Sequence, residues 1–274
     1  MPLAALSSAL RDPAVPRPVV GHAPALRRDP LALFEALARR HGGAAPIRLG
    51  PRRGVLLSEP PLVGRVFLAK PSRYTRHTPV YRAMARFLGD GILTTEGDDW
   101  RAHRRIVQPA FHRRRLAALA DTVVRIGDEM LEGWRGEMDV ADAMMRLTLR
   151  IVSEGLLGVR TAAEADAIGR AIDASQRYVE AVMSEVVPLP PVLPTPRNLG
   201  FRRARATLDR IAAGIIDERR ARGERGDDLV GMLLAARTED GRPLNRRRVR
   251  NELLTLLAAG HETTANALSW TLMR

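Results

Sequence analysis

The sequence predicts a mainly α-helical protein with a small β-hairpin near its N-terminus. Prolines interrupt the first thirty residues, and two short β-type runs follow them. From about Gly97 onward, apolar residues recur at the three- and four-residue spacing of helices. We expect residues 1–274 to form one incomplete domain: a Pro-rich opening segment (1–30), short helices with a hairpin (31–96) and a helical part (97–274).

The opening segment should be extended and irregular, because proline fixes φ and removes a backbone donor. Its prolines are Pro13, Pro16, Pro18, Pro24 and Pro30. Asp29 followed by Pro30 is typical of an N-cap and a first helical position. We therefore expect a helix over 31–40 with Leu33 and Leu37 on one face, ended by the glycines after His41.

A hairpin is predicted from the runs 47–49 and 55–57, joined by a turn over 50–54. A short helix should follow Pro60 and Pro61, ending at about Ala69. Residues 71–95 contain many loop-forming residues, with one short helix near 80–88.

The rest of the chain is predicted to be helical, and the Pro-rich stretch 188–196 should be a loop. Helices are expected near 97–108, 114–134, 141–158, 163–183, 198–223, 227–237 and 245–274. The last of these has one apolar stripe, made of Val249, Leu253, Leu256, Leu257, Gly260, Thr264 and Ala267. Because no stop signal precedes Arg274, we expect the chain to be a truncated product or the product of an incomplete reading frame.

Composition excludes several classes of site. The chain has no cysteine, so disulfides, zinc–thiolate sites and a thiolate ligand to a haem iron are excluded within it. No apolar run approaches the roughly 20 residues needed to span a bilayer, and no signal peptide is evident. We therefore expect a cytoplasmic protein without membrane contact.

The formal net charge of +13 raises an alternative, a non-enzymatic basic helical module that binds nucleic acid or a protein partner. Lys70 is the only lysine among 44 basic residues, and the arginines are spread along the whole chain. This distribution indicates coding bias rather than a phosphate-binding patch, so no nucleic-acid partner is expected.

The most informative segment is 259–264, Ala-Gly-His-Glu-Thr-Thr, in the last predicted helix. Gly260 costs a helix interior about 1 kcal/mol relative to alanine, and Thr263 can bond back to the carbonyl four residues earlier. Together with the acidic Glu262, these residues indicate a helix opened beside a bound group. The alternative is a packing glycine and a solvent-facing glutamate.

A zinc-protease H-E-x-x-H motif, which His261 and Glu262 would begin, is excluded, because the second histidine position holds Ala265.

A second pattern is Trp100-x-x-x-Arg104, whose two residues are neighbours on one helix face. An indole N–H and a guanidinium can together bind a buried carboxylate. The alternative is a stacked pair on a helix surface. His103 beside them is either a third donor or, as the sequence favours, a solvated histidine.

Both patterns resemble motifs of the cytochrome P450 family, and so do the loop 89–100 and the segment 108–111. The resemblance implies the N-terminal part of that fold and a haem b cofactor. It makes Thr263 and Glu262 the catalytic alcohol and acid. The implied haem-binding residues are Trp100, Arg104, His103, Ile92, Ala259 and Gly260. The implied substrate contacts are Leu93, Ala259 and Thr263, with further contacts around 78–88 and 178–187.

The family resemblance implies a monooxygenase that inserts one atom of O2 into an apolar organic substrate. Its electrons would come from a ferredoxin- or flavodoxin-type donor, for which Arg101, Arg105 and 113–115 offer a basic surface. The family's later E-x-x-R motif and cysteine ligand are absent from this sequence, so no metal ligand is assigned. We expect the chain by itself to be inactive.

Overall fold

The computed structural model describes residues 13–69, 74–158, 162–184, 189–223, 228–238 and 240–273. They form two compact units, and each is considered by itself. The first contains Met1–Val80 and Val179–Leu193, and the second contains Tyr81–Tyr178 and Pro194–Arg274. Lys70 and the first twelve residues of the predicted opening segment (1–30) lie outside the described residues.

The first unit contains the predicted hairpin and the helices around it. These elements are α2 (Ala23–Arg28), α3 (Pro30–His41), β1 (Ala44–Leu49), β2 (Arg52–Leu57), α4 (Pro60–Gly64) and the π-helix η1 (Arg65–Ala69). The Asp29 side chain accepts the Ala32 N–H at 2.9 Å and Pro30 is the first helical residue, which confirms the predicted helix start. Leu33 and Leu37 are fully buried in a small core with Ala45.

The hairpin is longer, and its turn tighter, than the sequence predicted. β1 and β2 pair antiparallel from Ala44 opposite Leu57 to Leu49 opposite Arg52. Only Gly50 and Pro51 connect the strands, and Gly50 has φ of 60°. A glycine at the first central position suits a type II′ turn, whose twist matches that of the flanking strands. The predicted five-residue turn was therefore wrong.

The second unit is helical, and its elements follow the predicted order. They are α5 (Pro79–Leu88), α6 (Gly97–Val107), the 3-10 helix η3 (Gln108–Phe111), α7 (Arg113–Glu132), α8 (Val140–Leu157), α9 (Ala162–Ser184), α10 (Pro196–Ala221), α11 (Leu229–Ala235) and α12 (Arg246–Leu272). Side chains cap several N-termini: Asp139, Thr195, Asp228 and Asn245 each accept a backbone N–H three residues on.

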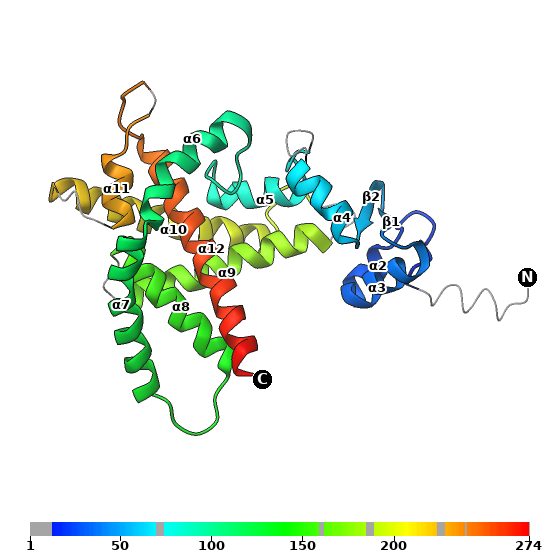
Figure 1. Cartoon of the computed structure of the whole chain (residues 1–274), viewed down its shortest axis with the longest axis horizontal. Helices are drawn as coiled ribbons and strands as arrows, with labels where there is room; N and C mark the ends of the chain where they lie inside the picture. Colours follow the sequence, from blue (N-terminus) through cyan, green and yellow to red (C-terminus); the bar gives the residue numbers. More distant parts are fainter. Residues whose placement is uncertain are drawn as a thin grey trace, which may run out of the picture. The chain divides into compact units, whose positions relative to one another are not determined.

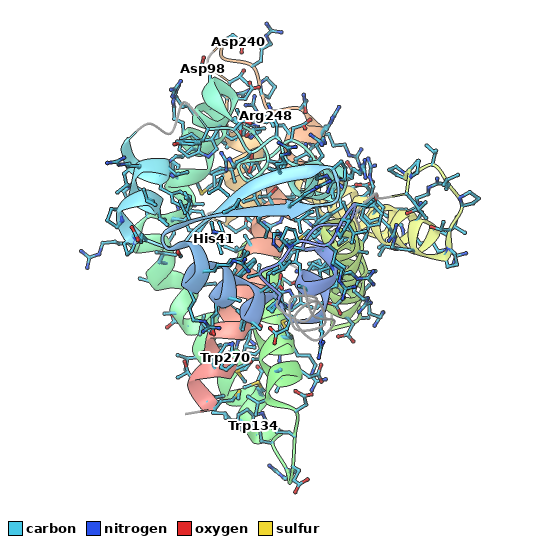
Figure 2. All side chains as sticks on the ribbon, turned by 90° about the vertical axis from the view of Figure 1, so that its right-hand side faces the viewer. His41, Asp98, Trp134, Asp240, Arg248 and Trp270 are labelled. Atoms are coloured by element: carbon cyan, nitrogen blue, oxygen red, sulfur yellow. The ribbon has the colours of Figure 1, made fainter. Side chains whose placement is uncertain are left out.

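Helix α12 is the centre of this unit (Figure 1). It packs most extensively on α8 and also touches α10 and α11. Figure 1 shows it running from the α11 end of the unit towards the end where α7 leads into α8. The starts of α6 and α12 lie towards the same end, as the labels Asp98 and Arg248 show in Figure 2. The predicted site residues on α6 and α12 therefore belong to one unit.

One prediction about this unit needs correction. On α12 the buried residues continue through His261 and Ala265, whereas Thr264 and Ala267 of the predicted stripe are exposed. Residues 178–184 are the last turns of α9, in agreement with the helix predicted over 163–183, and residues 185–187 lie outside the described part, so the substrate contacts expected around 178–187 stay a prediction. Tyr178 is buried and stacks on Phe201, with ring centroids 4.1 Å apart.

Candidate functional site

One face of α12 is covered near its N-terminus and open further along. Glu252 is 1% exposed, whereas Ala259 and Thr263 are exposed. At 3.6 residues per turn, positions seven and eleven residues after Glu252 lie within about 20° of it around the helix. The same face therefore changes from buried to open between Glu252 and Ala259. The small Ala259 side chain leaves room for a group to lie close to the helix backbone.

The Thr263 hydroxyl bonds back along α12, as predicted. Its Oγ1 donates to the Ala259 carbonyl at 2.7 Å. This bond uses the hydroxyl hydrogen, so both lone pairs of Oγ1 stay available to accept a hydrogen bond on the open face.

Gly260 and Glu262 are both engaged with neighbouring helices. A Cβ atom on Gly260 would lie 3.2 Å from Val152 of α8, so this glycine allows close helix packing. The Gln176 side-chain amide of α9 donates to the Glu262 carboxylate, and Glu262 is half-buried. Glu262 is therefore not the solvent-facing glutamate of the alternative interpretation.

His261 lies on the packed side of α12. It is 2% exposed, and its Nδ1 has no hydrogen-bond partner among the described residues. Burial lowers the pKa of His261 below its usual value, and the nearby Asp173 carboxylate and Met145 carbonyl oppose this effect. The imidazole is thus held in its neutral form between α8, α9 and α12.

Trp100 and Arg104 form the predicted pair on α6. The Arg104 guanidinium carbon lies 5.3 Å from the centre of the Trp100 ring. Arg104 is exposed and makes no ion pair with any residue that the structure describes. On the same helix, Arg101 pairs with Asp98. Arg104 is therefore a cation available for an external carboxylate.

His103 is not the solvated histidine that the sequence favoured. It is 5% exposed, and its Nδ1 contacts Glu252 Oε1 in a buried pair. Sequence reasoning missed Glu252, because this partner lies on α12, 149 residues further along the chain. The only sequence signal was an acidic residue within an apolar helical stripe.

The end of α5 and the loop that follows it are also held against α12, by hydrogen bonds that the sequence did not reveal. The Ile92 N–H donates to Glu252 Oε2 at 3.3 Å, and Asn251 Nδ2 donates to the Asp90 carbonyl at 3.3 Å. Arg250 donates to the carbonyls of Phe87 and Leu88, at 2.7 and 2.9 Å. The bond to Glu252 fixes the Ile92 backbone, and the others fix the chain just before it; Ile92 and Leu93 are half-buried.

The open face of α12 and the Trp100–Arg104 pair together suit a flat apolar group that carries a carboxylate. The face offers small and hydroxylated residues, and the pair on α6 offers an indole and a free guanidinium. A metal ion alone fits less well: the described residues contain no group of three or more His, Cys, Asp or Glu side chains that could hold one.

Comparison with known proteins identifies the family. The sequence profile described as Cytochrome P450 matches residues 12–274. The chain is 34% identical over 260 residues to cyclooctatin synthase of Streptomyces melanosporofaciens, covering 92% of this chain and 56% of that protein. It is 32% identical over 264 residues to cyclooctat-9-en-7-ol 5-monooxygenase of the same organism, covering 92% and 55%.

The fold agrees with this assignment. The solved structure titled "Retinoic acid bound cyanobacterial CYP120A1" superposes with a TM-score of 0.77 at 23% identity, covering 93% of this chain and 58% of that one. The chain belongs to the cytochrome P450 family. It spans little more than half the length of the curated relatives that it matches. None of the described helices is both long and apolar enough to cross a membrane.

Proposed function

We propose that this chain provides the oxygen-handling side of a haem-dependent monooxygenase that inserts one atom of O2 into an apolar organic substrate. The observation that carries the proposal is the open α12 face at Ala259 and Thr263, in the same unit as the unpaired Arg104. An exposed face of small and hydroxylated residues and a cation without an ion-pair partner among the described residues are two separate features that a haem site would use, and together they support the proposal.

Haem b fits these residues, and its iron would supply the activation of O2 when bound. The Trp100 N–H and the Arg104 guanidinium would bind a propionate. Ile92 and Ala259 would contact the ring region. Gly260, expected from the resemblance to do the same, lies against Val152 of α8 and would act by letting the two helices pack closely. His103 would act indirectly, because its Nδ1 already contacts Glu252.

Thr263 and Glu262 are the proposed catalytic residues. Thr263 Oγ1 lies on the open face, and its proton, which it donates to the Ala259 carbonyl in this structure, could turn to an acceptor bound on that face; Glu262 is the adjacent acid, oriented by Gln176. A hydroxyl beside a carboxylate can deliver a proton and be resupplied within a site that excludes bulk water. Leu93, Ala259 and Thr263 would contact the substrate.

The substrate class follows from the family and from a relative's name. Cyclooctat-9-en-7-ol 5-monooxygenase is named for oxidation of an unsaturated alcohol at one carbon. A largely apolar organic molecule of this kind is proposed here too. Electrons would come from a ferredoxin- or flavodoxin-type donor at the basic surface of Arg101 and Arg105. A cytoplasmic location remains a prediction from the sequence.

The absence of cysteine limits what the chain can do alone. A thiolate ligand pushes electron density towards haem iron and favours O–O cleavage, and this sequence cannot provide one. We therefore expect haem added to the purified chain to give a reduced carbonyl complex without the absorption signature of thiolate ligation. A thiolate-type spectrum would contradict this expectation.

The test of the proposed site is a haem titration that compares two arginines of one helix. Arg104→Ala should weaken haem binding at least about tenfold, because it removes a charged hydrogen-bond donor. Arg101→Ala, which removes an exposed arginine already paired with Asp98, is the matched control and should bind like the unchanged chain. Failure of the unchanged chain to bind haem, or equal losses in both variants, would overturn the proposal.

A further inference from the structure

The buried carboxylate of Glu252 joins three segments that are far apart in the sequence. One oxygen contacts His103 Nδ1 on α6, and the other accepts the Ile92 N–H from the loop before α6. Glu252 itself is on α12. All three groups belong to the second compact unit. We refer to Glu252, His103 and the Ile92 N–H as the Glu252 anchor.

Stability alone is a weak explanation for this anchor. Burying a carboxylate and an imidazole removes both from water, and well-packed apolar residues often stabilise a core as well as such a pair does. Buried polar groups do, however, impose a specific geometry, because their bonds form only in one arrangement. The anchor is therefore better explained by the arrangement that it enforces.

The surrounding contacts leave little freedom for the loop. A Cβ atom on Gly89 would lie 2.2 Å from Asn251 Oδ1, and one on Gly91 would lie 2.6 Å from Thr255 Oγ1. The loop backbone thus rests directly on α12, on both sides of Glu252 in the sequence. The anchor fixes where α6 begins relative to this helix.

The anchor is also on the face of α12 that opens towards the proposed site. Ala259 follows Glu252 by two helical turns, about 10 Å along the axis, and points in nearly the same direction. On α6, Trp100 and Arg104 flank His103 in the sequence. One buried carboxylate therefore fixes both the helix that carries the Trp100–Arg104 pair and the helix that carries Thr263.

We propose that Glu252 is a positioning residue, which holds α6 and the loop 89–95 in register on α12 and so sets the separation between the Trp100–Arg104 pair and Thr263. The use of that separation for haem rests on the proposed function, but the anchor itself does not. Glu252 itself would touch neither the substrate nor the cofactor, because both its oxygens are engaged by His103 and the Ile92 N–H, and it acts through these two residues.

The test uses hydrogen exchange and haem titration on the full chain. Glu252→Leu should speed amide exchange over residues 89–107 at least about tenfold, because the loop and α6 lose their common acceptor. Glu252→Gln, whose amide can still accept from Ile92 and donate to His103, should restore most of the protection. The control is Met144→Ala, which creates a cavity at a 2% exposed position on α8; it should leave exchange over 89–107 close to that of the unchanged chain.

The double variant Glu252→Leu with His103→Leu separates positioning from stability. It leaves no buried unpaired charge, so its melting temperature should recover towards that of the unchanged chain. Exchange over 89–107 should stay fast, and haem affinity should stay at least about tenfold weaker. Full recovery of protection in the double variant, or unchanged exchange in Glu252→Leu, would overturn the anchor. If the unchanged chain bound no haem, the proposed function would fail, and the exchange data would still decide on the anchor.

Discussion

The three buried histidines differ in the partners of their ring nitrogens. His22 uses both ring nitrogens: Nδ1 accepts the Arg48 N–H at 3.0 Å, and Nε2 lies 3.2 Å from the Ala14 carbonyl. His103 contacts a carboxylate, Glu252. His261 leaves Nδ1 without a partner among the described residues. An unsatisfied buried nitrogen is costly. Burial of this imidazole also lowers its pKa, so the stability of the chain depends on the pH around it.

The stability of the chain should therefore fall in mild acid partly because of His261. Burial lowers its pKa below the usual 6.5, only partly opposed by Asp173 and the Met145 carbonyl. Below pH 6.5 the unfolded chain binds a proton that the folded chain does not. The folded state then loses up to about 1.4 kcal/mol per pH unit from this group.

Urea unfolding of the chain and of His261→Gln at pH 7, 6 and 5 measures this effect. The variant should lose less stability than the unchanged chain between pH 7 and pH 5. His41→Gln, at an exposed position at the end of α3, is the control and should keep the full pH dependence. Parallel stability curves for the chain and His261→Gln would show that His261 does not titrate in this way.

At the residue scale, the sequence predicted neighbours along a helix but not partners across the fold. Trp100 and Arg104 are four residues apart, and helix geometry brings them together. The partner of His103 lies 149 residues away. Without knowledge of how α6 lies on α12, a histidine beside two charged residues is better explained as solvated, and that prediction was wrong.

At the scale of elements, the loop between α5 and α6 depends on glycine for two separate reasons. Gly89 has φ of 79°, and a Cβ there would meet Asn251 at 2.2 Å. Gly97, at the start of α6, has φ of 61° but open space around it. Comparing the two separates the cost of the backbone conformation from that of the contact with α12.

Gly89→Ala should destabilise the second unit by about 3 kcal/mol, since it adds a steric clash to the left-handed conformation. Gly97→Ala should cost about 1 kcal/mol from the conformation alone. Chemical denaturation of both variants, with unchanged slopes, checks the difference. Equal losses would mean that the loop moves away from Asn251 at little cost, and that the close packing on α12 is dispensable.

The starts of helices could be predicted because their signals are local in the sequence. The extent of a buried helix face could not be predicted in the same way. Asp29 with Pro30 marked the beginning of α3 correctly. On α12, the apolar stripe was extended to Thr264 and Ala267, and both are exposed. Periodicity identifies which residues share a face, but the neighbouring helices decide which part of that face is covered. The buried side of α12 continues instead through His261 and Ala265, which pack towards α8 and α9.

At the scale of the whole molecule, charge and apolar surface have different consequences. Many arginines pair with acidic residues of their own helix, such as Arg39 with Glu35 and Arg146 with Asp142. Such pairs are solvated and contribute little to stability. Large apolar side chains are also exposed, on α7 at Leu116, Val123, Val124 and Leu131, and near the end of α12 at Trp270, Leu272 and Met273.

These apolar residues predict that the chain associates with itself as its concentration rises. Large exposed apolar surfaces tend to become buried by contact with another molecule. Leu131 and Trp270 are 53% and 68% exposed. Trp134, two residues after the end of α7, and Trp270, near the end of α12, lie at the same end of the helical unit (Figure 2). Replacing Leu131 and Trp270 by serine should remove much of the surface that drives association.

Sedimentation of the chain over a range of concentrations provides the measurement. The average mass of the unchanged chain should rise with concentration, and Leu131→Ser with Trp270→Ser should reduce this rise. Val55→Ser is a suitable control, because Val55 on β2 is equally exposed, at 63%, but lies in the first unit. An equal reduction in the control would point to general apolar exposure rather than to α7 and α12. A chain that stays monomeric at all concentrations would show that these side chains do not drive association.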